Sequence, residues 1–176
     1  MSEQESYYHS MPEREFGDFC VAFVDCLGFA HAVNSHMETA TCEEDVVSLP
    51  LFRGLKHLHA QAIRSKSTQV GNPDWLNIQP RFRVFSDSAF IYLPNSAEGI
   101  RGLIGMVQGL TVMLAQHGFF VRGAIAVGKL FASQDVVIGP AINEAARLEK
   151  FSYYPRVILS EQAAKLSAGT ELNAAL

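Results

Sequence analysis

Hydrophobic residues along this chain occur both in short continuous runs and in longer periodic stretches. The continuous runs are rich in β-branched and aromatic residues, as in strands that are covered on both faces. They predict strands at 19–24, 82–85, 89–93, 119–127 and 157–159. Apolar residues three or four positions apart instead predict amphipathic helices at 43–65, 100–116 and 141–150. Shorter helices are expected from Phe29 to about His36 and from about Ser160 onward.

The order of these elements predicts the fold class. Strands alternate with helices, but two strands are separated only by Ser86-Asp87-Ser88, which predicts a hairpin with a carboxylate at its tip. An α+β fold of ferredoxin-like kind, a mixed sheet with packed helices, accommodates both features. The polar residues 1–18 are expected to form a flexible leader, residues 67–80 a loop, and residues 19–176 a single domain.

Composition and net charge limit the kinds of molecule that this protein is expected to bind. The chain has 176 residues, 48% of them apolar, which is enough for a core without disulfides or structural metal. Its 14 Lys and Arg against 18 Asp and Glu give a formal charge of −4, so neither nucleic acid nor a membrane is an expected partner. The sequence shows no apolar run of membrane-spanning length and no signal peptide, and we expect a cytoplasmic protein. The three cysteines show no metal-binding spacing and are expected to be reduced.

Asp25 is the first candidate for chemistry. It ends a buried strand, and Gly28 follows three residues later, where the chain can turn tightly. Such a turn brings backbone N–H groups close to phosphate oxygens while the carboxylate holds a metal. The alternative is that Asp25 merely caps the helix that follows.

Asp87 is the second candidate, at the tip of the predicted hairpin. If the hairpin lies beside the first strand, Asp25 and Asp87 meet at one end of the sheet and repel each other. A divalent cation relieves that repulsion, and Mg²⁺ or Mn²⁺ typically binds one or two carboxylates together with substrate phosphates. The alternative is that Asp87 only forms the turn.

The third candidate is a polar pair on the helix expected at 141–150. Asn143 and Arg147 are four positions apart and therefore project from one face. An asparagine can orient a ribose oxygen, and an arginine can stabilise charge on a phosphoryl group in transfer. The alternative is that Arg147 pairs with Glu144 or Glu149 on a solvated face.

Taken together and in this order, these motifs resemble class III nucleotide cyclases, the adenylate and guanylate cyclase family. That family shows F-x-D-x-x-G-F, a hairpin aspartate, a strand resembling R-x-G-I-x-x-G, and G-x-x-x-N-x-A-x-R. Here the corresponding segments are 23–29, Asp87, 121–128 and 139–147. The resemblance runs from about Phe19 to Ser160 and implies the class III nucleotide cyclase fold.

The resemblance also implies an activity and its residues. The expected reaction converts a nucleoside triphosphate into a 3′,5′-cyclic mononucleotide and pyrophosphate, with two divalent metal ions, Mn²⁺ or Mg²⁺, as cofactors. Asn143 would position the ribose and Arg147 would stabilise the transition state. The family further implies a homodimer in which the metal carboxylates and the Asn/Arg pair of one active site come from different chains. The metal site is expected at Asp25, Cys26 and Asp87, and the triphosphate on the backbone that includes Leu27, Gly28 and Phe29.

Two positions depart from the purine cyclases of this family. The residues that select the base there correspond to Arg83 and Val136 here, and neither purine pair is present. The five N–H donors of an arginine match the carbonyl oxygens of uracil, whereas adenine has no exocyclic carbonyl. The chain also resembles the pyrimidine cyclases of Pycsar antiphage systems, so UTP and cyclic UMP are favoured over CTP and over ATP or GTP. The product would activate a downstream effector in bacterial antiphage defence.

Several alternatives stay open. The phosphate-binding lysine that the family places in a late hairpin has no evident counterpart; the sequence is truncated, the lysine is replaced, or Lys129 serves. The chain could be a catalytically silent nucleotide-binding dimerisation module, although all four of Asp25, Asp87, Asn143 and Arg147 are present. A diguanylate cyclase relative is disfavoured because Phe85-Ser86-Asp87-Ser88 stands where a G-G-D-E-F-like hairpin would be.

Overall fold

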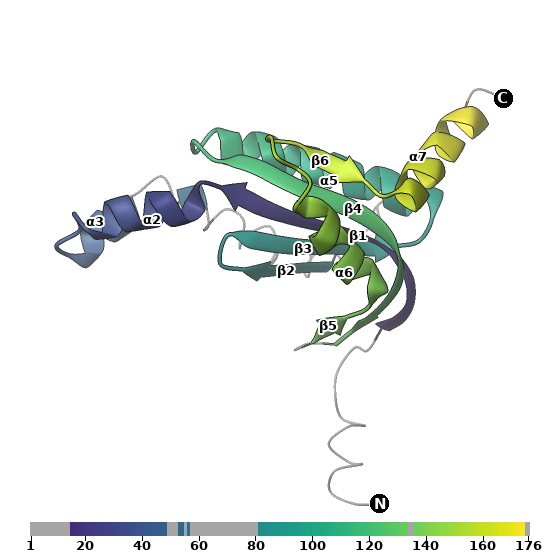
Figure 1. The fold of residues 1–176 in the computed structure, drawn as a ribbon, viewed down its shortest axis with the longest axis horizontal. Helices are drawn as coiled ribbons and strands as arrows, with labels where there is room; N and C mark the ends of the chain where they lie inside the picture. Colours follow the sequence, from purple (N-terminus) through teal and green to yellow (C-terminus); the bar gives the residue numbers. More distant parts are fainter. Residues whose placement is uncertain (1–14, 49–52, 55, 57–80, 134–135, 175–176) are drawn as a thin grey trace, which may run out of the picture.

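A computed structural model describes residues 15–48, 53–54, 56, 81–133 and 136–174 of the chain. The elements in chain order are β1 (Glu15–Leu27), α2 (Phe29–Met37), α3 (Glu43–Ser48), β2 (Arg81–Phe85), β3 (Ser88–Pro94), α5 (Ala97–Ala115), β4 (Phe120–Ala132), β5 (Val137–Ile138), α6 (Pro140–Glu149), β6 (Val157–Leu159) and α7 (Glu161–Ala174). Figure 1 shows the strands gathered into one sheet, with α2 and α3 extending away from it beyond the end of β1.

The sheet is mixed and is built on two long central strands. Its strand order is β2-β3-β1-β4-β5, and β6 lies parallel to β4. β1 and β4 pair antiparallel over their whole length, from Glu15 opposite Ala132 to Leu27 opposite Phe120. The β2–β3 hairpin adds to the other side of β1 and brings Ser88 opposite Asp25. This register places the hairpin tip beside the end of β1.

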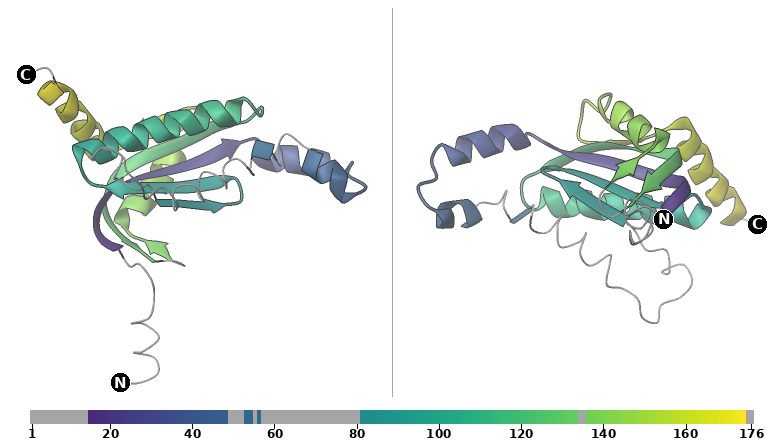
Figure 2. Two further views of the ribbon diagram at one scale, coloured as in Figure 1. Left: turned by 180° about the vertical axis from the view of Figure 1, so that it is seen from behind. Right: turned by 90° about the horizontal axis from the view of Figure 1, so that it is seen from below.

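Alternation along β1 divides the core into two layers. Cys20, Ala22, Val24 and Cys26 face the apolar side of α5, whose buried residues include Ile100, Leu103 and Val107. Residues of the other parity, beginning with Val21, face α6 through Ala141 and Ile142. α5 and α6 therefore lie on opposite faces of the sheet (Figure 2). Asp25 has the parity of Val21, so its side chain belongs to the α6 face.

The expected α+β fold with a mixed sheet and packed helices is confirmed, as is the hairpin around Asp87. Helix α5 begins after Ser96, whose hydroxyl accepts a hydrogen bond from the Gly99 N–H at 3.0 Å. No helix in the described part of the chain combines the length and the apolar character that crossing a membrane requires.

Several elements differ from the sequence-based expectation. The first strand begins at Glu15 instead of Phe19, so residues 15–18, expected in the leader, belong to β1. β4 continues to Ala132 because its additional residues pair with this longer β1. The two-residue strand β5 was not expected. Of the helix expected at 43–65, α3 forms the first part, and most of the remainder, like the loop at 67–80, lies outside the described residues.

Candidate active site

Two carboxylates meet where β1 ends. Asp25 is the third residue from the end of β1, and Asp87 lies in the turn between β2 and β3. Strand pairing brings the two segments together: Asp25 lies opposite Ser88, and the Cys26 N–H donates to the Asp87 carbonyl at 3.3 Å. The structure thus joins the first two candidates of the sequence at one end of the sheet.

The electrostatics of Asp87 reflect this proximity. Partial burial raises the pKa of the Asp87 carboxyl above its ordinary value, and the negative charge of Asp25 raises it further. Hydrogen bonds to the Asp87 carboxylate from its own backbone and from Ser86 lower the pKa of Asp87, but the raising effects of burial and of Asp25 prevail. Two carboxylates that lie this near to each other form a site that a bound cation would stabilise.

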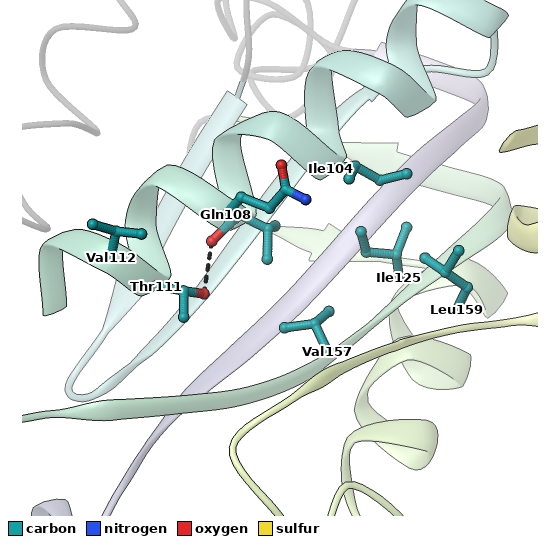
Figure 3. A pocket seen from close by; sticks show the side chains of 8 residues that line it. Ile104, Gln108, Thr111, Val112, Ile125, Val157 and Leu159 are labelled. Carbon is teal, nitrogen blue, oxygen red and sulfur yellow. Dashed lines mark hydrogen bonds between the residues drawn. The ribbon is translucent and has the colours of Figure 1, made fainter. Parts of the chain in front are cut away.

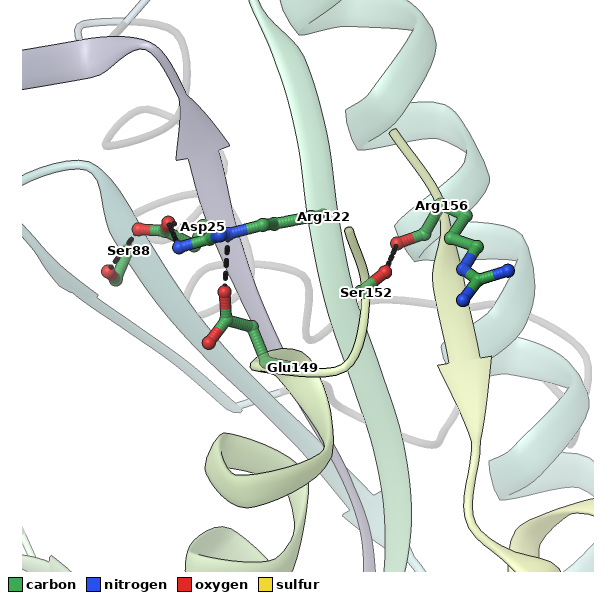
Figure 4. Close-up of polar contacts among 6 residues, drawn as sticks. All are labelled: Asp25, Ser88, Arg122, Glu149, Ser152 and Arg156. Atoms are coloured by element: carbon green, nitrogen blue, oxygen red, sulfur yellow. Dashed lines mark hydrogen bonds and ion pairs between the residues drawn. The ribbon is translucent and has the colours of Figure 1, made fainter. Parts of the chain in front are cut away.

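Asp25 has two further partners, one on each oxygen (Figure 4). The Ser88 hydroxyl donates to Oδ1 at 3.0 Å. Arg122, directly opposite Asp25 on β4, donates to Oδ2 from Nε at 3.3 Å and from Nη2 at 3.2 Å. The Asp25 carboxylate is therefore held from both sides.

Arg122 also contacts a carboxylate on α6. Its Nε lies 2.5 Å from Oε1 of Glu149, the last residue of that helix. Because the Nε–H is directed at Asp25 and no hydrogen bond reaches Oε1, this second contact is a Coulombic ion pair. Glu149 is only 5% exposed, and desolvation raises the pKa of its carboxyl, with Arg122 acting in the opposite direction.

A tight turn follows the carboxylates. Gly28 has φ of 78°, in the left-handed region that glycine adopts at little cost, and it precedes the first residue of α2. The backbone N–H groups of the first helical turn after Gly28 are of the kind that bind phosphate oxygens. Cys26 turns its side chain into the core, where burial raises the thiol pKa to about 12. Any contribution of Cys26 to a metal site would therefore come from its backbone carbonyl.

Asn143 and Arg147 lie exposed on α6. The Arg147 guanidinium donates to Glu144, at 2.9 Å from Nε and 2.8 Å from Nη2, the pairing that the surface alternative anticipated. Among the described residues, no hydrogen bond or ion pair joins Asn143 or Arg147 to Asp25 or Asp87. Within one chain the structure does not unite the two halves of the expected site.

The two expected base-selecting positions are linked through Ser133. Arg83 Nη2 donates to the Ser133 carbonyl at 2.9 Å. Ser133 in turn holds Val136, accepting its N–H on Oγ at 3.1 Å and donating its own N–H to the Val136 carbonyl at 2.8 Å. Arg83 on β2 is therefore connected to Val136 through Ser133 at the end of β4.

The donor set fits a hard divalent ion that is shared with substrate. No group of three or more His, Cys, Asp or Glu side chains with metal-binding geometry occurs among the described residues. Mg²⁺ and Mn²⁺ are commonly held by one or two carboxylates together with phosphate oxygens and water, and Asp25 and Asp87 supply that number. Their proximity at the end of β1, set by the β1–β3 register, is the observation in favour of such an ion.

An apolar pocket lies on the face of the sheet that α5 covers (Figure 3). It has a volume of about 410 Å³ and lies between α5 and strands β4 and β6. Ile104, Val107 and Ile125 are among its lining residues, and they carry no charge. The pocket is therefore separate from the carboxylates.

Three residues of the site had no assigned role in the sequence. Ser88 belongs to the predicted hairpin and Arg122 to the segment 121–128 that the sequence singled out, whereas Glu149 appeared only as a surface partner for Arg147. Arg122 was detectable as the single charged residue within the apolar run 119–127. A charged side chain in such a strand requires a partner, but the sequence does not say which one.

Comparison with solved structures relates this geometry to known folds. The adenylyl cyclase CyaB from P. aeruginosa superposes with a TM-score of 0.64 at 16% identity, over 89% of this chain and 83% of that one. The catalytic core of a rhodopsin-guanylyl cyclase with converted specificity, in complex with ATPαS, gives 0.60 at 15% identity, over 89% and 84%. This chain has the class III cyclase fold.

A third structure with this fold is described as a class III adenylyl cyclase-like ATP-binding protein from Pseudomonas aeruginosa. It superposes with a TM-score of 0.62 at 11% identity, over 90% of this chain but 37% of that one. At the level of sequence, no protein-family model and no curated protein matches the chain. The relationship to class III cyclases therefore rests on the fold.

Proposed function

We propose that this protein is a metal-dependent nucleotidyl cyclase that converts UTP into cyclic UMP and pyrophosphate. The proximity of Asp25 and Asp87, which the pairing of Asp25 with Ser88 and the Cys26 N–H bond to the Asp87 carbonyl impose, is the observation that carries the proposal, because neighbouring carboxylates are costly without a cation. Their place beside the Gly28 turn, at the start of a helix, provides for the triphosphate that a cyclase must bind. The class III cyclase fold supports the same reaction class.

The reaction forms one P–O bond and breaks another. The ribose 3′-oxygen attacks the α-phosphorus, and the bond from that phosphorus to the oxygen bridging to the β-phosphate breaks, releasing pyrophosphate. The 3′-hydroxyl proton passes to solvent, so no protein base is required. Divalent ions, when bound, make the 3′-oxygen a better nucleophile and neutralise the leaving phosphates.

In this mechanism the chain orients the reactants and neutralises charge. Asp25, Asp87 and the Cys26 carbonyl would hold the ions, and the backbone of Leu27, Gly28 and Phe29 would bind the phosphates. Asn143 would orient the ribose, and Arg147 would stabilise the charge that develops on the transferring phosphoryl group. For this, Arg147 must exchange Glu144 for the substrate, which is feasible because the side chain is exposed.

The preference for UTP rests on Arg83. The bond from Nη2 to the Ser133 carbonyl holds the guanidinium next to Ser133, which in turn binds Val136. A guanidinium offers only donors, and uracil presents two carbonyl acceptors, whereas Val136 offers no polar side chain to a purine. In this proposal cyclic UMP is a second messenger of bacterial antiphage defence, made in the cytoplasm by a homodimer, and it acts on a downstream effector.

The direct test is to incubate the purified protein with Mn²⁺ and each of ATP, GTP, CTP and UTP, and to identify the products by mass spectrometry. We expect cyclic UMP and pyrophosphate in equal amounts. Asp25→Asn and Asp87→Asn should each reduce kcat/KM about 10³-fold, because several kcal/mol of charge stabilisation is lost. Asp18→Asn is the matched control, since Asp18 lies exposed on the same strand.

Two outcomes would revise the proposal. Another cyclic nucleotide as the main product would overturn the assignment to uracil but not the reaction. No cyclic product from any nucleotide, with nucleotide binding retained, would overturn the reaction and favour a silent nucleotide-binding module.

A further inference from the structure

We propose that Arg122, anchored by Glu149, is a positioning residue that together with Ser88 aims the Asp25 carboxylate at the cation site beside Asp87. This inference rests on the proposed function, since it concerns the metal that the cyclase reaction would use. It assigns roles to three residues that the mechanism above does not employ.

The first argument is the way in which Asp25 is held. Ser88 binds one carboxylate oxygen and Arg122 binds the other, so rotation of the carboxylate about its Cβ–Cγ bond would break at least one of these contacts. Each carboxylate oxygen accepts about two hydrogen bonds or metal bonds, so the two N–H groups of Arg122 occupy Oδ2, whereas the single Ser88 donor leaves acceptor capacity on Oδ1. Asp25 is therefore fixed in orientation and can still bind a metal.

The second argument is that Arg122 is itself fixed. It lies directly opposite Asp25 in the β1–β4 register, and the strands approach closely here: a Cβ on the neighbouring Gly123 would lie 2.5 Å from the Phe23 carbonyl oxygen. Glu149 then holds the guanidinium from the α6 side. Because Glu149 is buried and ends a helix packed on the sheet, it is a rigid anchor.

The third argument is the balance of charge. Asp25, Asp87 and Glu149 are three carboxylates, and Arg122 contacts two of them, Asp25 and Glu149. When all four groups are ionised, three negative charges and one positive charge leave a net charge of −2. An ion pair that served only packing would need one carboxylate, whereas this cluster keeps an excess of negative charge next to Asp87. A divalent cation matches that excess.

Metal-binding carboxylates in proteins are commonly oriented by hydrogen-bonding neighbours, and loss of such a neighbour typically weakens metal affinity or activity by about 10–100-fold. The test measures Mn²⁺ binding to the nucleotide-free protein by EPR, from the amplitude of the free Mn²⁺ signal. Two variants leave the net charge of the cluster unchanged. Arg122→Lys retains the positive charge but loses the planar fork, and the double variant Arg122→Gln/Glu149→Gln removes one charge of each sign.

We expect the dissociation constant for Mn²⁺ to rise about 10–100-fold in both variants and by a smaller factor in Ser88→Ala. Matched controls come from the exposed pair Arg101 and Glu98 on α5: Arg101→Lys and Arg101→Gln/Glu98→Gln should leave Mn²⁺ binding unchanged. Circular dichroism and thermal unfolding identify any variant that does not fold. If the double variant fails to fold, the Mn²⁺ affinities of Arg122→Lys and Ser88→Ala provide the test.

Unchanged Mn²⁺ affinity in folded Arg122 variants would overturn the proposal and leave Arg122 with a packing role. Tighter binding would also overturn it, because Arg122 would then be a cation that competes with the metal. Mn²⁺ binding by the Asp25→Asn variant distinguishes failure of the positioning role from failure of the proposed function. If Asp25→Asn does not weaken Mn²⁺ binding, the carboxylate site itself is wrong, whereas loss of binding in Asp25→Asn alone contradicts only the positioning role.

Discussion

At the scale of single residues, the fold holds acidic side chains together in spite of their repulsion. Burial and the charge of Asp25 both raise the pKa of Asp87 above its ordinary value of 3.8. The folded protein therefore binds more protons than the unfolded chain when the pH lies between the two pKa values. Through that window the stability of the metal-free protein falls as the pH rises.

Asp87→Asn should remove this pH-dependent loss of stability. In EDTA we expect a higher Tm than wild type at neutral pH, and the difference should shrink as the pH is lowered towards the ordinary carboxyl pKa, where wild-type Asp87 becomes protonated. With Mn²⁺ the order should reverse, because only wild type gains stability from the bound ion. Thermal unfolding at several pH values measures both effects. A variant less stable than wild type in EDTA at neutral pH would contradict this account.

A second prediction at this scale concerns Arg83. Arg83→Lys keeps the positive charge but replaces the planar guanidinium and its five N–H donors with a compact ammonium group. The preference for UTP over ATP should therefore fall about 10–100-fold, which corresponds to the loss of one charge-assisted hydrogen bond. Competition between UTP and ATP, with both products measured, gives the ratio. Arg81→Lys is the matched control, since Arg81 lies two residues earlier on β2 and binds Glu15 instead. A change of selectivity in both variants would argue against a specific role for Arg83.

At the scale of elements, local sequence signals placed most helices and strands correctly. Ser96 marks the start of α5 because its hydroxyl accepts a helix N–H, and Ser86-Asp87-Ser88 marks a turn because such residues tolerate it. Residues 15–18 carried no such signal. Only Phe16 among these four residues is apolar, and the segment forms a strand because residues 129–132 of β4 pair with it. That pairing depends on residues that lie more than 100 positions away in the sequence.

The junction between β5 and α6 gives a prediction at this scale. Gly139 has φ of 153°, and a Cβ there would lie 2.5 Å from the Lys129 carbonyl oxygen. Gly139→Ala should therefore destabilise the protein by about 1–3 kcal/mol and displace the start of α6, which carries Asn143. Gly105→Ala is the control of opposite sign: it lies within α5 with open space around it and should stabilise the protein by about 0.5–1 kcal/mol.

Urea unfolding of the two alanine variants measures both values. Equal stability of Gly139→Ala and wild type would show that the β5–α6 junction relaxes without cost. A loss of stability in Gly105→Ala would show that α5 is sensitive to any added methyl group.

At the scale of the whole molecule, the proposed site is divided between chains. Asp25 and Asp87 lie at the end of β1, whereas Arg147 lies exposed on α6 and pairs with its neighbour Glu144. In the proposed homodimer each active site takes its carboxylates from one chain and its Asn/Arg pair from the other. A monomer would then hold two incomplete halves.

Mixing Asp25→Ala chains with Arg147→Ala chains tests this division. Each parent homodimer should be inactive, whereas a heterodimer has one intact site. Random mixing makes about half of the dimers mixed, so about a quarter of wild-type activity should return. Cyclic product formation after co-refolding measures the recovery. An inactive heterodimer, isolated with two different tags and confirmed to be folded, would contradict shared sites.

The sequence by itself determined the alternation of strands and helices, the hairpin around Asp87 and the turn at Gly28, because periodicity, caps and glycine conformation act within a few residues. Only the tertiary structure decided which side chains share one site. Asp25 and Arg122 are 97 positions apart, and their contact depends on the register of β1 against β4. A shift of that register by one residue would place Arg122 on the opposite face from Asp25, and no local pattern specifies it. The anchoring of Arg122 by Glu149 likewise exists only because α6 packs on that face of the sheet.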